Sequence, residues 1–262
     1  MGRVITVPAH PQRVISLVPS QTELLFDLGL DDLIVGVTKF CIYPADKVRE
    51  KRRVGGTKQL QLDAIHQLQP DLIIGNKEEN CRDDILELAE SYPVWMSDIM
   101  TLDDAIDMIR RVGEVVAKRD TANTLAHQIA SSFSELPALA RPLRVAYFIW
   151  RKPLMVAGAN TFINDMLGRC GMANAFADRQ RRYPEVSLEE VNAAGLDAIL
   201  LSSEPYPFRE KHRAAFTDQF PGTLVHLVDG EKMSWYGSRL RFAPSYMKDL
   251  IGRLQRRRHN SE

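Results

Sequence analysis

Short apolar runs and helix-like segments alternate from one end of the chain to the other. The apolar runs are rich in Val, Ile and Leu, as is typical of strands that are covered on both faces. We predict strands at residues 14–18, 33–37, 72–74, 93–95, 145–150, 198–201 and 224–227. The helical periodicity of the segments between them favours an α/β fold with largely parallel sheets.

The first predicted strand is followed almost directly by a predicted helix. The stretch RVISLVPSQTELLFDLGL (13–30) passes from an apolar run through Pro19 into a helical pattern that ends at Gly29. Ser20 and Glu23 have the spacing of a capping box, so we predict that these two side chains cap the helix. Such a turn begins a parallel α/β unit, and it can also hold a ligand at the carboxyl end of the strand.

The region from Thr101 to Leu136 contains no proline and one glycine, Gly113, and its apolar side chains recur at helical spacing. One unbroken helix of this length would be about 54 Å long, which exceeds what a small α/β domain can bury. We therefore predict a single long helix that joins two lobes. A break near Lys118–Asp120, giving two ordinary helices, is the alternative. The predicted lobes are residues 1–100 and 138–262, with the connecting helix at 101–137.

The two halves of the chain resemble each other. LDAIHQLQPDLIIG (62–75) aligns without a gap with LEEVNAAGLDAILL (188–201), and residues 13–29 have a looser counterpart in residues 144–168. A period of half the chain indicates two similar lobes, because a solenoid needs shorter and more numerous repeats. Two such lobes would set their strand-to-helix turns opposite one another. Because a cleft between domains is a preferred place for a small ligand, we predict a binding site there.

Composition narrows the classes of partner. The 262 residues carry 34 basic and 34 acidic side chains, so the chain lacks the strong field of a general nucleic-acid binder. No apolar run approaches the ~20 residues of a membrane span. The first residues also lack the apolar core of a signal peptide. Either a leader was removed or the protein stays in the cytoplasm.

Sequence motifs of enzymes are absent. The chain has no G-x-S-x-G, G-x-G-x-x-G or G-x-x-x-x-G-K-[ST] segment. No two of its six histidines lie within four residues of each other, and Cys41, Cys81 and Cys170 form no CxxC pair. We therefore expect no catalytic residues, no cofactor and no metal ion held by the protein itself.

Aromatic, basic and amide side chains gather in the predicted loops. Flat rings can stack on a planar or bulky ligand, and basic side chains can pair with its anionic oxygens. For each residue alone, packing is as good an explanation as ligand contact, whereas the set favours a ligand. The ligand-binding candidates are Ser20, Gln21, Lys39, Phe40, Tyr43, Lys58, Asn76, Lys77, Trp150, Arg151, Tyr183, Tyr206, Trp235, Tyr236 and Arg239.

The order of several motifs resembles a known family. R-V-I-S-L-V-P-S-x-T-E-L-L-F-x-L-G, then V-G-V-T, Y-P, V-G, L-D-A-I and P-D-L-I-I-G, resembles the substrate-binding proteins of bacterial ABC importers for metal chelates. The family includes vitamin B12 and ferric siderophore receptors, and the resemblance covers about residues 10–253. It implies two Rossmann-like lobes with mostly parallel sheets joined by one long backbone helix, as in class III periplasmic binding proteins.

The resemblance also implies roles for single residues. An acid at the start of a helix in each lobe docks onto permease arginines in this family, and Asp63 and Glu189 occupy the matching places. Tyr183 falls where the B12 receptor has a ligand-facing tryptophan, and Trp235 lies in a late loop where that receptor has an aromatic residue. Thr57 and Asn76 replace two of its ring-stacking tryptophans, so the identity of the chelate stays open.

The function implied by the resemblance is capture, without catalysis, of a metal chelate and its delivery to an ABC permease dimer. A ferric siderophore, cobalamin or another corrinoid, and haem are the candidate ligands, each carrying its own Fe or Co. The family works as monomers outside the cytoplasmic membrane, in the periplasm, although this chain shows no leader. An intracellular α/β enzyme or chelatase acting on a tetrapyrrole is the alternative function. A signalling or scaffold module with the same fold is a third reading.

Overall fold

The computed structural model describes residues 4–137, 139 and 141–259, with side chains up to residue 256, and the chain forms two compact units. Unit 1 comprises Met1–Ile99, Asp103–Ala130 and Tyr236–Arg239. Unit 2 comprises Met100–Leu102, Ser131–Trp235 and Leu240–Glu262. Each unit is an α/β structure built around its own sheet, which confirms the predicted fold class.

Unit 1 contains a five-stranded parallel sheet with the order β3-β2-β1-β6-β7 and a separate two-stranded hairpin, β4–β5. The strands are β1 Val14–Ser16, β2 Ile34–Val37, β3 Arg52–Arg53, β4 Gly55–Gly56, β5 Gln59–Leu60, β6 Leu72–Asn76 and β7 Val94–Ser97. The helices that begin in it are α1 Pro19–Asp27, α2 Ala45–Val48, α3 Leu62–Leu68 and α4 Arg82–Ser91. They are followed by α5 Leu102–Val115 and α6 Arg119–Ser134.

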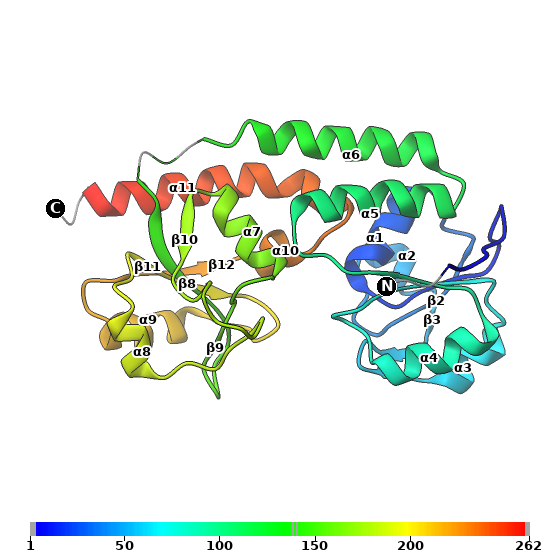
Figure 1. The fold of residues 1–262 in the computed structure, drawn as a ribbon, viewed down its shortest axis with the longest axis horizontal. Helices are drawn as coiled ribbons and strands as arrows, with labels where there is room; N and C mark the ends of the chain where they lie inside the picture. The colour runs from blue at the N-terminus through cyan, green and yellow to red at the C-terminus, as the bar shows by residue number, and fades with distance from the viewer. Residues whose placement is uncertain (1–3, 138, 140, 260–262) are drawn as a thin grey trace. The chain divides into compact units, whose positions relative to one another are not determined.

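The sheet of unit 1 is covered on both faces. Every residue of its central strands β1 and β6 is buried, which shows this. Figure 1 shows α3 and α4 on one side of this sheet and α1 and α5 on the other. Ile15 and Ile73 of the central strands pack with Ile65 of α3 and Leu88 of α4 in one hydrophobic core. The continuous apolar runs of the sequence therefore correspond to strands between two helical layers.

Unit 2 contains a sheet with the order β10-β8-β11-β12, which is parallel except for β9, an antiparallel strand beside β8. The strands are β8 Leu143–Trp150, β9 Met155–Val156, β10 Met172–Asn174, β11 Ala198–Ser202 and β12 Leu224–Val228. The helices are α7 Phe162–Arg169, α8 Leu188–Ala193, α9 Glu210–Gln219, α10 Gly230–Ser234 and α11 Ala243–His259. A 3-10 helix, η1, spans Ser238–Phe242.

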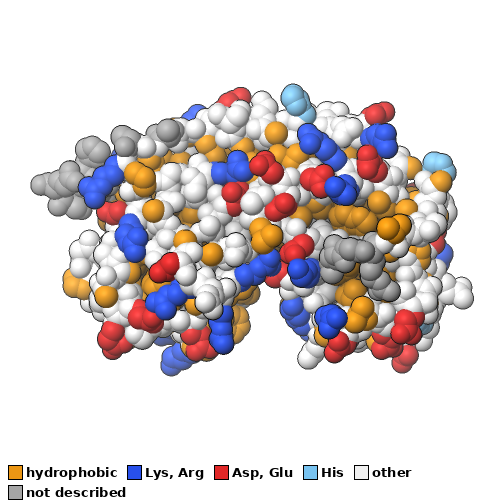
Figure 2. All heavy atoms as spheres, viewed as in Figure 1, with side chains coloured by type: hydrophobic (Ala, Val, Ile, Leu, Met, Phe, Trp, Pro, Cys, Tyr) orange, Lys and Arg blue, Asp and Glu red, His pale blue; other side chains and the backbone are white. Residues whose placement is uncertain are grey.

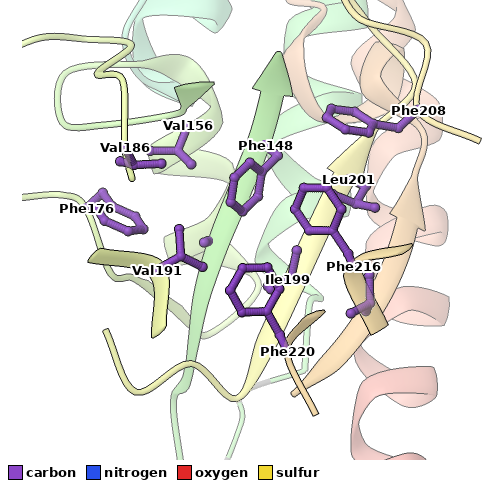
Figure 3. Packing of buried hydrophobic residues seen from close by; sticks show 12 residues of the cluster. Phe148, Val156, Phe176, Val186, Val191, Ile199, Leu201, Phe208, Phe216 and Phe220 are labelled. Atoms are coloured by element: carbon purple, nitrogen blue, oxygen red, sulfur yellow. The ribbon is translucent and has the colours of Figure 1, made fainter. Parts of the chain in front are cut away.

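Aromatic side chains form the core between the sheet of unit 2 and its helices α8 and α9. Figure 3 shows the rings of Phe148, Phe216 and Phe220 beside Ile199 and Val191. The Phe148 and Phe216 rings meet edge to face with their centroids 5.2 Å apart, an arrangement that aromatic pairs prefer. This core corresponds to the one beneath α3 and α4 in unit 1.

The strand register repeats between the units. Val14 lies opposite Leu72 in unit 1, and Val145 lies opposite Ala198 in unit 2, as the alignment of the two halves requires. The Asp71 carboxylate accepts a hydrogen bond from the Arg13 backbone N–H at 2.8 Å. The matching Asp197 carboxylate accepts one from Arg144 at 2.7 Å. The internal repeat therefore reflects two units of the same construction.

Each of those two arginines also holds the end of a helix. The Arg13 Nε group donates to the Leu68 carbonyl at 2.9 Å, and the Arg144 Nε group donates to the Ala194 carbonyl at 2.6 Å. Leu68 and Ala194 are equivalent positions of the repeat, at the carboxyl ends of α3 and α8. The side chains thus satisfy helix carbonyls that have no partner within the helix.

The predicted single helix at 101–136 is wrong, because the chain forms two helices, α5 and α6. The Lys118 N–H bonds to the Gly113 carbonyl and the Ala117 N–H to the Glu114 carbonyl, which is the Schellman pattern. Ala117 takes the left-handed conformation, with φ 56°. The alternative break near Lys118–Asp120 is therefore confirmed; the apolar pattern continues across it because both helices bury an apolar face.

The predicted capping box at Ser20 and Glu23 is also wrong. Helix α1 begins at Pro19, two residues earlier than a cap at Ser20 would place it, with Val18 at the N-cap and no side-chain cap. Proline suits the first helical position, because its ring fixes φ and its missing N–H would have no helix partner. Ser20 is therefore inside the first turn, and the Glu23 carboxylate is bonded elsewhere.

Charges of both signs are mixed on the surface in view. Figure 2 shows Lys and Arg side chains interspersed with Asp and Glu, in keeping with a formal net charge of zero. Over the part of the chain that the structure describes, no helix combines the length and the apolar character that crossing a membrane requires.

Candidate functional site

The loops that carry most of the predicted ligand residues follow the carboxyl ends of parallel strands in each unit. In unit 1 the segment after β2 holds Lys39, Phe40 and Tyr43, and the segment after β6 begins at Lys77. Because β1, β2, β6 and β7 are parallel, these segments leave the sheet at the same edge. Ligands of open α/β sheets bind at this edge.

The loop after β2 exposes some side chains and buries others. Lys39 and Phe40 are exposed, and the Lys39 ammonium lies 5.1 Å from the centre of the Phe40 ring. Cys41 is fully buried, with its sulfur 3.1 Å from the Thr22 hydroxyl. Burial raises the pKa of the Cys41 thiol, so it stays protonated at neutral pH.

Tyr43 and Arg239 come together beside Glu23. The Arg239 guanidinium donates two hydrogen bonds of 2.8 Å, one to each oxygen of the Glu23 carboxylate. Its central carbon lies 3.9 Å from the centre of the Tyr43 ring. The side chains of Arg239 and Glu23 are only 13% and 11% exposed. The guanidinium therefore already has an anionic partner and an aromatic surface.

A buried amide and hydroxyl group cluster lies at the same edge of the unit 1 sheet. Gln21 and Asn76 both donate to the Ser97 hydroxyl, at 2.5 Å and 3.0 Å. The Asn76 side-chain oxygen accepts the Glu78 N–H at 2.8 Å. Gln21 and Asn76 thus tie α1 and the loop after β6 to β7. Their contact with a ligand stays a prediction.

Two lysines of unit 1 are exposed at this edge. Lys58, in the β4–β5 turn, donates to the Glu78 carbonyl, and Lys77 forms an ion pair with Asp98 at 2.7 Å. An ion pair at the surface contributes at most about 1 kcal/mol, so the Lys77 ammonium can be recruited by an anionic ligand.

Unit 1 also contains a cavity of about 910 Å³ beside its edge strand β7. It is lined by side chains of α4, β7 and α5, including Ile85, Met96 and Met108. Of the predicted ligand residues, only Lys77 reaches its lining. The cavity and the predicted ligand residues are therefore largely separate features.

In unit 2, an aromatic group forms where the segments after β8 and β11 meet. Trp150 is 39% exposed, and its ring lies 5.7 Å from that of Tyr206 in an edge-to-face arrangement. The centroid of the Tyr206 ring lies 4.8 Å from that of the Phe208 ring. The Trp150 indole N–H donates to the Lys152 carbonyl at 3.1 Å. Trp150 is thereby fixed with part of its ring open to solvent.

His212 packs against this aromatic group, with the centroid of its ring 5.4 Å from that of the Tyr206 ring. Its Nδ1 atom accepts the Arg209 N–H at 2.9 Å, so its ring proton is on Nε2, 3.3 Å from the Tyr206 hydroxyl oxygen. Burial lowers the pKa of His212, and the nearby Arg151 charge lowers it further. The imidazole is therefore neutral at pH 7.

Arg151 and Tyr183 are half-buried and lie in neighbouring segments of unit 2. The chain after Tyr183 runs antiparallel to β9, with hydrogen bonds from Val156 to the Pro184 carbonyl and from Val186 to the Leu154 carbonyl. A side chain at Gly158 would come within 2.6 Å of the Arg181 carbonyl, so glycine is required there.

Trp235 and Tyr236 follow α10. The Trp235 indole N–H donates to the Glu204 carboxylate at 2.7 Å, and the Ser234 hydroxyl donates to the same oxygen at 3.0 Å. Trp235 is half-buried, whereas Tyr236 is buried. Sequence reasoning missed the roles of Glu204 and Glu23, because an acid that bonds a distant side chain has no local signature.

Asp63 and Glu189 occupy equivalent positions, each the second residue of a short helix and each exposed. Helix α8 begins with a full capping box between Ser187 and Glu190. The Ser187 hydroxyl and the backbone N–H of Glu189 lower the pKa of the Glu189 carboxyl, so it is ionised at neutral pH.

A sequence model described as "periplasmic binding protein" matches residues 14–224. The chain is 29% identical over 192 residues to the vitamin B12-binding protein of Vibrio cholerae, covering 72% of this chain and 69% of that one. The periplasmic vitamin B12 binding protein BtuF of Vibrio cholerae has a similar structure. Its TM-score is 0.80 at 23% identity, and the match covers 95% of this chain and 99% of that chain.

A second similar structure is the periplasmic heme-binding protein RhuT from Roseiflexus sp. RS-1. Its TM-score is 0.78 at 24% identity, covering 93% of this chain and 97% of that chain. At these identities the structural matches establish the fold alone.

Proposed function

Because the chain belongs to the periplasmic binding protein family, we propose that it captures a metal chelate outside the cytoplasmic membrane and delivers it to the permease of an ABC importer. The observation that carries this proposal is the set of aromatic and basic side chains at the strand ends of both units, with Phe40 and Trp150 open to solvent. The names of the vitamin B12- and heme-binding relatives support it. The alternative enzymatic function has no comparable support.

The proposed ligand is a bulky, ring-containing chelate with anionic groups. Exposed rings offer stacking surfaces, and Lys39, Lys58, Lys77 and Arg151 supply positive charge in the same loops. Haem and ferric siderophores combine these features, and cobalamin offers the bulk and the apolar edges. In each case the ligand brings its own metal.

The proposed docking residues for the permease are Asp63 and Glu189. They are exposed acids at equivalent helix starts of two similarly built units, so they present matching charges to a partner with two equivalent basic surfaces. The Glu189 charge is secured by its hydrogen bonds, which lower the pKa of the carboxyl.

A titration of intrinsic tryptophan fluorescence tests the proposed ligand class. Haem, cyanocobalamin and a ferric siderophore are each added to the full chain. We expect one of them to quench the emission with a dissociation constant below the micromolar range, because Trp150 is partly exposed beside the loop residues. Trp150→Phe should remove most of the quenching. Absence of binding by all three ligands would contradict the proposal.

A further inference from the structure

One edge of the sheet in unit 1 is open. β7 is the last strand in the order of the sheet, and among the described strands it pairs with β6 alone. The Lys77 N–H bonds to the Ser97 carbonyl, so Ser97 and Trp95 direct their backbone groups at β6. Val94 and Met96 alternate with them and direct their backbone groups outward. No described residue forms a backbone hydrogen bond with these outward groups.

The cavity of about 910 Å³ beside β7 has the form of a slot for one further strand. Its walls come from both helical layers of the unit, α4 on one face of the sheet and α5 on the other (Figure 1). The α4 wall is mainly apolar, with Ile85, Ala89 and Leu86, and Leu86 is 42% exposed. The α5 wall carries the ion pair of Asp107 with Arg111. The slot therefore suits a strand whose side chains alternate between apolar and polar.

The described start of the chain has the composition and the length of such a strand. The Val4–Val7 segment consists of four β-branched residues, which favour strands, and β7 is also four residues long. Ile5 and Val7 are half-buried, whereas Val4 and Thr6 are exposed, as in a strand with one covered side. Val4 and Ile5 already line the slot. No described residue forms a backbone hydrogen bond with the segment.

The connection to β1 sets the direction of the Val4–Val7 segment. The chain bends at residues 9–10 and again at residues 12–13 before β1 begins at Val14. Figure 1 shows the dark blue start of the chain doubling back in this way. Since β1, β6 and β7 are parallel, the segment runs antiparallel to β7. Its N–H and C=O groups can therefore form an antiparallel ladder with the outward groups of β7.

We propose that the slot is a docking site for an extended strand and that its occupant is the Val4–Val7 segment of the same chain, which closes on β7 as an antiparallel sixth strand. Closure gives hydrogen-bond partners to the backbone groups of both strands and places Ile5 and Val7 against the apolar wall of α4. An open strand edge is a template for pairing with another chain, so the closed segment also prevents association through β7. This pairing is independent of the proposed function.

Hydrogen exchange of single amides, measured by NMR on the full chain, tests the pairing. The inward amides of Trp95 and Ser97 bond to β6 and report that the sheet of unit 1 is intact. The outward amides of Val94 and Met96 are protected only when a strand covers the edge. In the wild type they should exchange about a hundredfold more slowly than in an unstructured peptide, or slower still. Exchange of the outward amides at the unstructured rate would overturn the proposal.

A double variant identifies the strand that covers the edge. Ile5→Asp combined with Val7→Asp places two charges against an apolar wall. It should accelerate exchange of the outward amides about tenfold or more and leave the inward amides slow. The matched control is Ala9→Asp combined with His10→Asp, which adds two carboxylates at exposed positions beyond the segment and should keep all wild-type rates. Protection that survives the first double variant would mean another occupant and would rule out the Val4–Val7 segment.

A second copy of the chain is the competing occupant of the slot. Pairing between two copies would make the protection of the outward amides increase with protein concentration, and sedimentation equilibrium would show a dimer. Pairing within one chain predicts a monomer and exchange rates that stay constant over an about tenfold range of concentration. Rates that depend on concentration would therefore refute the assignment to the same chain.

Discussion

Single polar side chains fix the ends of the elements that carry the candidate site. At the start of α8, the Glu190 carboxylate accepts the Ser187 N–H at 2.8 Å and pairs with Arg179 at 2.6 Å. Both contacts lower the pKa of Glu190, the hydrogen bond from Ser187 more than the ion pair. A lowered pKa means that folding favours the ionised carboxylate, so this contribution to stability depends on pH.

We predict that Glu190→Gln lowers the free energy of unfolding at pH 7. The glutamine keeps the capping geometry but loses the charge. The difference from wild type should be constant well above the ordinary Glu pKa of 4.5 and should disappear as the pH falls through the lowered folded-state value. Urea unfolding measured from pH 7 to pH 3 checks this. A difference that grows in acid would contradict it, and Glu185→Gln, at an exposed acid nearby, is the control.

Helices α5 and α6 form a hairpin whose packing depends on one missing side chain. A Cβ atom at Gly113 would lie 2.2 Å from the Ala122 Cβ, closer than two such atoms can approach. The helices therefore meet where both residues are small. This close contact, together with the left-handed Ala117, explains why the region 101–136 turns back instead of continuing as one helix.

We predict that Gly113→Ala destabilises the protein by about 1–3 kcal/mol, the usual cost of overpacking, although alanine is the better helix former. Gly168→Ala in α7 is the matched control, because its new methyl group would meet no atom within 4 Å. It should stabilise the protein by about 0.4–1 kcal/mol. Chemical denaturation measures both changes. Equal effects of the two substitutions would argue against the close helix contact.

At the scale of the whole molecule, the chain is built from two units of the same plan. The equivalent pairs Arg13–Asp71 and Arg144–Asp197 close the same strand–helix–strand arrangement in each unit. The exposed acids Asp63 and Glu189 stand at the opposite ends of the helices that these arginines hold. The duplication thus produces two equivalent acidic positions without any further element.

We predict that Asp63→Lys combined with Glu189→Lys leaves chelate affinity within about twofold of wild type and abolishes association with the cognate permease, since charge reversal replaces attraction by repulsion. Ligand titration and binding to the permease in nanodiscs measure the two effects separately. The control is Asp83→Lys combined with Glu210→Lys, which reverses exposed acids in the first turns of α4 and α9. Retained association of the Asp63 and Glu189 variant would refute the docking assignment.

Local pattern was enough to predict seven of the strands, the α/β class, the repeat and the family. It missed β3, β4, β5, β9 and β10, which are two or three residues long and too short to show a periodic pattern. The apolar runs around Val14, Leu72, Val145 and Ala198 all became central strands, because a strand buried on both faces needs an apolar side chain at nearly every position. Most of the aromatic and basic residues were correctly placed in loops, but Trp150 is the last residue of β8 and Arg239 lies in η1. The sequence could not predict which of them are exposed: Phe40 is exposed, whereas Tyr43, three residues later, is half-buried.

The sequence by itself thus determined the order of the seven predicted strands, the α/β class and the similarity of the two halves, because periodicity and residue type act between near neighbours. Only the tertiary structure decided which polar groups bond to each other. Three contacts join segments that no local pattern links. They are the ion pair of Glu23 with Arg239, the close approach of Gly113 to Ala122 and the hydrogen bond from Trp235 to Glu204. Each depends on distances that exist only once the chain is folded.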